Sequence, residues 1–135
     1  MTPAQREAWF KYHPPTDETR PKYAAIRDAE SAFVAAVTAA AYENLSTSAL
    51  YEEISRQALR MADTIDANAP DCADKTAAIR CVRLARNFFN EWATQRALPA
   101  EQWSWHDIRV LFAAGELELC KARMQANAAI ACGGV

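Results

Sequence analysis

Apolar residues recur every three or four positions along most of the chain, which is typical of helices that bury one face. The clearest stripe lies in residues 50–65, and its members are Leu50, Ile54, Ala58, Met61 and Ile65. A second stripe follows in a helix predicted to begin at Lys75, and its members are Ala78, Ile79, Val82, Ala85 and Phe89. Asn68, Pro70 and Asp71 separate the two stripes, and Asp74 has the residue type of an N-cap. The pattern therefore predicts a helical hairpin with a short turn.

Two helices are predicted before this hairpin. Residues 2–13 form a short one, which Thr2 caps and Pro14–Pro15 end, because proline cannot donate a backbone hydrogen bond. Thr16 or Asp17 caps the second, which runs to about residue 41. The polar stretch 44–48 then breaks the chain before the first leg of the hairpin.

The remaining elements are predicted from caps and breakers. Ser46 or Thr47 caps the first leg of the hairpin, and Leu98–Pro99 ends the second. Residues 99–115 hold a short helix that starts after Ser104, and a separate final helix covers 116–131. The apolar stripe predicted for that final helix consists of Leu117, Cys120, Met124, Ala128 and Ala131.

Composition supports helices over sheet. The chain has 135 residues, 51% of them hydrophobic and only 3 of them glycine, and alanine is abundant. A length of this order suits one domain. We therefore predict a single all-α domain over residues 1–135, a helical hairpin or bundle with a short N-terminal helix.

The net charge and the lack of a long apolar run limit the classes of binding partner that we expect. The net charge is −2, from 15 basic and 17 acidic residues, which argues against a general DNA or RNA coat but leaves room for a local basic pocket. No apolar run approaches the roughly 20 residues that cross a bilayer, and the N-terminus does not resemble a signal peptide. We expect a cytoplasmic protein without a membrane partner.

Signatures of metal, cofactor or catalytic sites do not occur in the sequence. The 4 cysteines lack CxxC spacing and only 2 histidines accompany them, so no metal site and no cofactor are expected. There is no recognisable Ser/His/Asp or Cys/His signature and no glycine-rich phosphate loop. We therefore expect a protein that is not an enzyme.

Five residues are candidates for ligand binding. Tyr12 and His13 precede the two prolines, and Tyr12 is either a stacking platform or a packing tyrosine. Lys22 and Arg27 follow on the next helix, where Arg27 either forks onto a phosphate or belongs to a solvated face. Asn127 borders the stripe of the final helix, so its amide contacts a ligand, sets the register against a partner, or is exposed. A basic run over 75–86 is an anion-binding strip, an oligomer rim or the polar side of a helix.

Three blocks of the chain together resemble a known family. They are FKYHPPTDETRPKYAAIRDA (10–29), DANAPDCADKTAAIRCVR (66–83) and KARMQANAAIACGGV (121–135). The YH–P doublet, the PDCADKT turn and the MQANAAIA ending, in this order, are similar to the small phage helical-hairpin proteins that act as anti-CBASS and Thoeris anti-defence sponges. Such proteins sequester cyclic nucleotide immune signals.

The resemblance implies an all-helical protomer that forms a homo-oligomer, with ligand pockets between protomers. Its ligands would be cyclic di- or trinucleotides or cyclic ADP-ribose isomers, bound without cleavage. Carried over, Tyr12 would stack on the ligand and Arg27 would meet a phosphate, with Lys22 as the alternative cation.

Two inserts, 38–64 and 84–120, separate the blocks. They either lengthen the hairpin or form an added lobe with Trp92, Trp103 and Trp105 at its core. In the competing interpretation the hairpin is an assembly module of an adaptor or structural phage protein, and the Trp-rich insert binds a protein partner. A phosphodiesterase is a weaker alternative because a metal-ligand cluster is missing.

Overall fold

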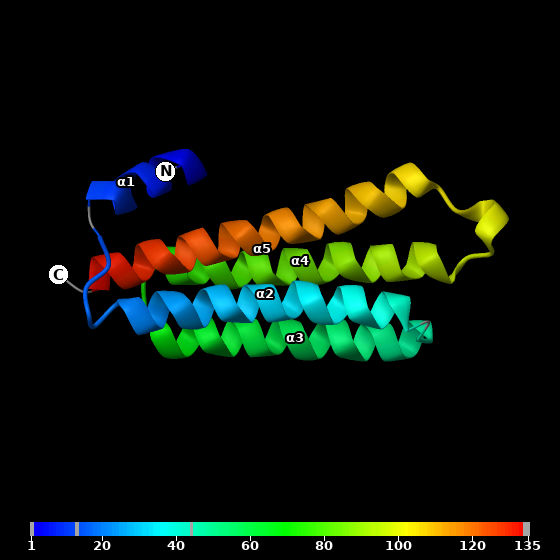
Figure 1. The fold of residues 1–135 in the computed structure, drawn as a ribbon, viewed down its shortest axis with the longest axis horizontal. Helices are drawn as coiled ribbons and strands as arrows, with labels where there is room; N and C mark the ends of the chain where they lie inside the picture. Colours follow the sequence, from blue (N-terminus) through cyan, green and yellow to red (C-terminus); the bar gives the residue numbers. More distant parts are fainter. Residues whose placement is uncertain (1, 13, 44, 134–135) are drawn as a thin grey trace.

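Four long helices run antiparallel, side by side, and a short helix lies over one end of the last of them (Figure 1). The structure, a computed structural model, describes residues 2–12, 14–43 and 45–133. Its elements are α1 (Pro3–Tyr12), α2 (Arg20–Tyr42), α3 (Thr47–Asn68), α4 (Ala73–Ala97), the 3₁₀ turn η1 (Ala100–Gln102) and α5 (Trp105–Gly133). The described ranges contain no strand, so the prediction of an all-α fold is confirmed.

The helices form a ring in which α2 neighbours α3, α3 neighbours α4, α4 neighbours α5, and α5 closes on α2. Contact is closest between α4 and α5 and sparsest between α5 and α2. Alanine-rich helices can approach closely, which accounts for the tight α4–α5 pair. The α2–α5 seam is therefore the place where the bundle is most open.

Polar caps set two helix starts as predicted. Ser46 Oγ accepts a hydrogen bond from the Ala49 amide at 3.2 Å. At α1 the Thr2 hydroxyl accepts from the Gln5 amide at 3.2 Å, and Gln5 Oε1 accepts from the Thr2 amide at 2.7 Å, which is a reciprocal capping box. The predicted starts of α2 and α4 were displaced: α2 has Thr19 as its N-cap, and α4 has Cys72 rather than Asp74.

Lys75 stabilises the turn between α3 and α4. Its side chain is largely buried, and Nζ donates to the Asp66 carbonyl at 3.0 Å and to the carboxylates of Asp66 and Asp71, each at 2.9 Å. These bonds place a cation on the last turn of α3, where free carbonyls carry partial negative charge. Lys75 is thus committed to the turn, whereas Arg80 and Arg83 of the same basic run are exposed.

The prediction of two separate helices over 99–131 was wrong, because α5 runs unbroken from Trp105 to Gly133. Gly115 lies inside the helix rather than between two helices. A Cβ added there would lie 2.8 Å from the Phe89 ring of α4, so this glycine serves close helix approach. A mid-helix glycine normally costs helix stability, and here the packing of a large ring against bare backbone offsets that cost.

Replacing Gly115 by alanine should therefore lower the free energy of unfolding by about 1–2 kcal/mol, because overpacking outweighs the gain in helix propensity. Phe89 cannot move aside, since it is fully buried with ring-centroid distances of 5.5 Å to Phe33 and 5.2 Å to Phe112. Urea unfolding followed by circular dichroism measures the change. Adding Phe89→Leu to the variant should recover part of the loss. A stabilised Gly115→Ala protein would show that propensity alone governs the site.

The stripe predicted for the C-terminal helix was also partly wrong. Leu117 is 55% exposed, while Met124 and Ala128 are buried as expected. The buried face of α5 consists of Ile108, Leu119, Ala122, Met124, Ala126, Ala128, Ala129 and Ile130. Two apolar stripes run side by side on this helix, and the contact with α4 and α2 selects the one that contains Leu119.

The two segments that separate the blocks are part of the long helices of the bundle. Residues 38–64 fall in α2, α3 and the turn between them, and 84–120 fall in α4, η1 and α5. Trp92 packs edge-on to Phe112 with centroids 5.1 Å apart, as part of the bundle core. The three blocks that carry the family resemblance meet at the opposite end, beside α1 (Figure 1).

Candidate functional site

A cavity of about 570 Å³ opens in the α2–α5 seam at the end where the three blocks meet. We call it the arginine pocket. The described residues that line it are Pro15, Arg20, Tyr23, Ala24, Arg27, Arg123, Met124 and Asn127. Its volume lies within the range of small-molecule sites in proteins.

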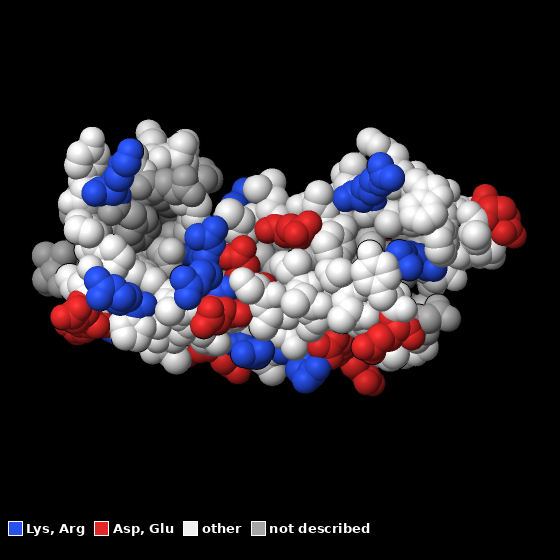
Figure 2. Space-filling view, in the orientation of Figure 1, with Lys and Arg blue, Asp and Glu red and all other residues white. Residues whose placement is uncertain are grey.

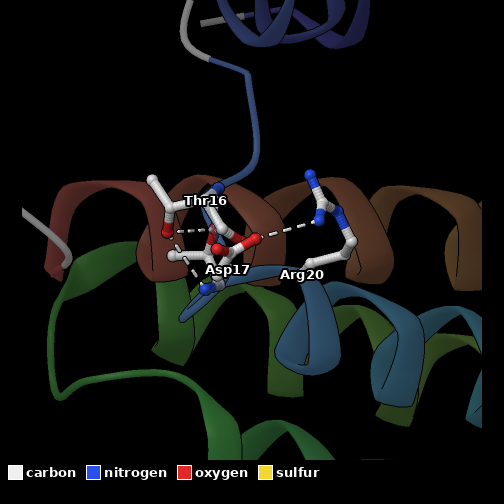
Figure 3. Close-up of polar contacts among 4 residues, drawn as sticks. Thr16, Asp17 and Arg20 are labelled. Carbon is white, nitrogen blue, oxygen red and sulfur yellow. Dashed lines mark hydrogen bonds and ion pairs between the residues drawn. The ribbon is translucent and has the colours of Figure 1, made fainter.

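The start of α2 presents one wall of the arginine pocket. The Thr16 amide donates to Thr19 Oγ1 at 2.8 Å, and the Thr19 amide donates to Thr16 Oγ1 at 3.2 Å, which fixes the turn that enters the helix (Figure 3). Arg20, Tyr23 and Arg27 then follow at intervals of three and four residues, so they share one face of the helix. That face is turned to α5.

The α5 wall is held by an ion pair across the seam. Arg123 Nε lies 2.5 Å from Glu30 Oε2, and both side chains are mostly buried. Burial lowers the pKa of Arg123, but the Glu30 carboxylate and the Cys120 sulfur more than compensate, so the pKa is raised and the guanidinium stays charged. The pair also sets the register of α2 against α5.

Three arginines and no carboxylate line the pocket in the described part of the chain. The acidic partners lie outside it: Arg20 pairs with Asp17 at 3.2 Å, and Arg27 Nε is 3.5 Å from Asp28 Oδ1. These pairs are exposed and so contribute little stability. A bound anion can replace Asp17 and Asp28 at small cost. Figure 2 shows basic side chains over this part of α2, beside a hollow between α1 and the bundle.

Asn127 brings a polar amide to the lining. Its Oδ1 atom is buried and has no hydrogen-bond partner among the described residues. Leaving a buried amide oxygen unpaired costs free energy, and rotating the amide toward the cavity would let a ligand or water satisfy it. Of the three roles foreseen for Asn127, simple exposure is excluded, since the residue is half-buried.

The sequence candidates separate into those that line the pocket and those that do not. Arg27 and Asn127 line it. Lys22 is half-buried on α2 but does not, and Tyr12 at the end of α1 is 82% exposed and outside the lining. His13 lies outside the described residues.

Three lining residues with polar groups were missed as site candidates: Arg20, Tyr23 and Arg123. The spacing of Arg20, Tyr23 and Arg27 was a signal that they share a face. Arg123 gave a similar signal, because it precedes Asn127 by four residues. Nothing local indicated that Arg123 meets Glu30, which is 93 residues away in the chain.

Burial raises the pKa of Tyr23 above its usual 10.0, a hydrogen bond with Thr19 opposes the rise, and Cys132 adds to it. The neutral, half-buried phenol therefore contributes stability that is present below pH 10 and lost as the pH rises through the folded-state pKa. In a spectrophotometric tyrosine titration, the difference between wild type and Tyr23→Phe should have its midpoint above pH 10.0. A midpoint at or below that value would contradict the burial of this phenol.

The lining holds no obvious catalytic group. No carboxylate, histidine, cysteine or serine lines the pocket among the described residues, and no cluster of three potential metal ligands occurs there or elsewhere in the described ranges. None of the described helices combines the length and apolarity needed to cross a bilayer.

The chain was compared with known proteins in three ways. No protein-family model matches it, and no curated protein and no solved structure is significantly similar.

Proposed function

We propose that this protein is a phage anti-defence sponge, which binds cyclic nucleotide immune signals in the host cytoplasm and holds them without cleavage. The observation that carries the proposal is the arginine pocket, a cavity of about 570 Å³ with three arginines, a tyrosine and an asparagine in its described lining. Cations for phosphate, a ring for a base and an amide for a base edge are the groups that a nucleotide needs.

The proposed roles follow from how firmly each cation is held. Arg20 and Arg27 have exposed acidic partners, so their guanidinium groups are free to turn onto the two phosphates of a cyclic dinucleotide. Arg123 is tied to Glu30 and acts as a fixed wall. Tyr23 and Met124 offer an apolar surface to a base, and the unpaired Asn127 amide accepts from or donates to its edge.

Tyr12 enters the proposal through a second copy of the chain. Its ring is 82% exposed and lies outside the pocket lining of its own protomer. The family resemblance implies pockets between protomers, so we propose that Tyr12 of one protomer stacks on the ligand held by another. The 55% exposed Leu117 is available for the homo-oligomer contact that this requires.

A recovery experiment tests the proposed function. The protein is incubated with each cyclic di- and trinucleotide and with cyclic ADP-ribose isomers, and the free ligand is measured after ultrafiltration. Sequestration predicts that one ligand disappears from the filtrate and returns intact when the protein is denatured. A converted ligand would indicate an enzyme instead. If the concentration of every ligand in the filtrate is undiminished, the sponge function is contradicted.

An adaptor function is the second candidate, and one observation favours it. At the far end of the bundle Trp105 is 58% exposed and meets Trp103 edge-on, with ring centroids 5.2 Å apart. An exposed tryptophan is a frequent anchor of protein interfaces. A Trp105→Ser variant would lose an adaptor's partner in co-purification from infected cells, whereas a sponge would keep its ligand unchanged in that variant.

A further inference from the structure

A second cavity opens in the α2–α5 seam, at the end of the bundle opposite to the arginine pocket, and has a volume of about 300 Å³. We call it the distal pocket. Tyr42 comes from α2, Trp92 and Arg96 from α4, and Arg109 and Phe112 from α5. Basic side chains are visible at this end of the same face in Figure 2. Nothing in the proposed sponge function uses these residues.

Arg96 is held in place before any ligand arrives. Its guanidinium carbon lies 5.6 Å from the ring centroid of Trp92 and 5.5 Å from that of Trp103. Trp103 is fixed in turn, because its Nε1 donates to the Leu98 carbonyl at 2.5 Å. Two aromatic faces attract and orient the cation, so less side-chain entropy is lost when it pairs with a ligand.

The distal pocket carries an excess of positive charge. Neither Arg96 nor Arg109 forms an ion pair with any carboxylate in the described part of the chain. Glu116 is the one carboxylate among the described lining residues. Two guanidinium groups against one carboxylate leave a net charge of about +1, which favours a ligand with a single negative charge.

Aromatic rings form the apolar part of the distal pocket. Trp92 is buried and meets Phe112 edge-on at 5.1 Å, so together they present a rigid apolar floor. Tyr42 stands at the rim with 87% of its surface exposed, and its ring is open to contact. A flat ring that enters here gains stacking and edge contacts without displacing the core.

We propose that the distal pocket binds a small planar aromatic carboxylate, with its ring against Trp92 and Phe112 and its carboxylate paired with Arg96 and Arg109. A cavity of about 300 Å³ is at the small end of ligand sites, which suits one ring or two fused rings. The planar guanidinium of Arg96 matches a carboxylate through two parallel N–H donors. This site is independent of the arginine pocket.

Calorimetric titration with 1-naphthoate tests the proposal, with the uncharged 1-naphthamide as the matched probe. We expect saturable binding of naphthoate and clearly weaker binding of the amide. Arg109→Gln should raise the Kd for naphthoate about tenfold, because one charge-assisted bond is lost. The control Arg80→Gln, on an exposed position of α4, should keep the wild-type Kd, and circular dichroism confirms that both variants fold.

Three results would each overturn the assignment: no saturable binding of naphthoate to the wild type, equal affinity for the amide, or an unchanged Kd in the folded Arg109→Gln variant. Arg27→Gln should leave naphthoate binding intact, since Arg27 lies at the other end of the seam. A higher Kd for the cyclic nucleotide in that variant, with an unchanged Kd for naphthoate, separates the two sites. If no cyclic nucleotide binds, the sponge function is contradicted, but the assignment of the distal pocket to an aromatic carboxylate is unaffected.

Discussion

Replacing Phe89 by alanine should lower the free energy of unfolding by about 3–5 kcal/mol, the largest effect expected of a single substitution in this protein. Phe89 is fully buried between Phe33, Phe112 and the bare backbone of Gly115. Removing the ring leaves a cavity where three helices meet, and rigid neighbours limit its collapse. Urea unfolding at neutral pH measures the change.

The adjacent residue provides a matched control. Phe88 is half-buried on the same helix, so Phe88→Ala removes the same atoms from a less enclosed place and should cost about 1–2 kcal/mol. A Phe88→Ala protein that loses as much stability as Phe89→Ala would contradict the position of the core described above.

If the protein is a sponge as proposed, replacing Arg27 by glutamine should raise the Kd for its cyclic nucleotide by about tenfold to a hundredfold, because a charge-assisted hydrogen bond to phosphate is lost. Arg27 lines the arginine pocket, and its exposed partner Asp28 is easily replaced by a ligand. Glutamine keeps most of the length of the side chain, so the change reports on charge. Isothermal titration of both proteins gives the ratio of Kd values.

Lys22 is the matched control for Arg27. The sequence left open which of the two cations meets the phosphate, and the structure places Lys22 outside the pocket lining. Lys22→Gln should therefore keep the Kd within about threefold of the wild type, in keeping with a long-range charge effect alone. A larger loss in Lys22→Gln than in Arg27→Gln would reverse the assignment.

The buried face of a helix with many large apolar residues could be predicted from the sequence, whereas the buried face of a helix with many small residues could not. In α3 all members of the stripe from Leu50 to Ile65 except Ala58 have large side chains, and every member is buried. In α5 four of the eight buried apolar residues are alanines, so Leu117 and Leu119 gave equal local signals. Contact with the other helices determines that Leu119 is buried and Leu117 is exposed. Gly115 likewise has its reason in Phe89, 26 residues earlier in the chain.

The sequence indicated candidate residues on α2 and on α5 separately, but it did not indicate that they meet in one site. Asn127 stood out beside an apolar stripe and Arg27 through the family resemblance, and the structure brings both to one cavity. The antiparallel register that joins them depends on Glu30 and Arg123, and no local pattern predicts that pair. The stacking role of Tyr12 came from the family resemblance, and its ring is exposed and lies outside the described lining of the arginine pocket.

Isothermal titration of the wild-type protein with a panel of cyclic dinucleotides, cyclic trinucleotides and cyclic ADP-ribose isomers tests the central claim most directly. We predict that at least one member binds with a Kd of about a micromolar or tighter, as expected for two phosphates and a stacked base. Tyr12→Ala should weaken that binding if the pocket is completed by a second protomer. The absence of binding heat at two temperatures for every ligand of the panel would contradict the sponge function.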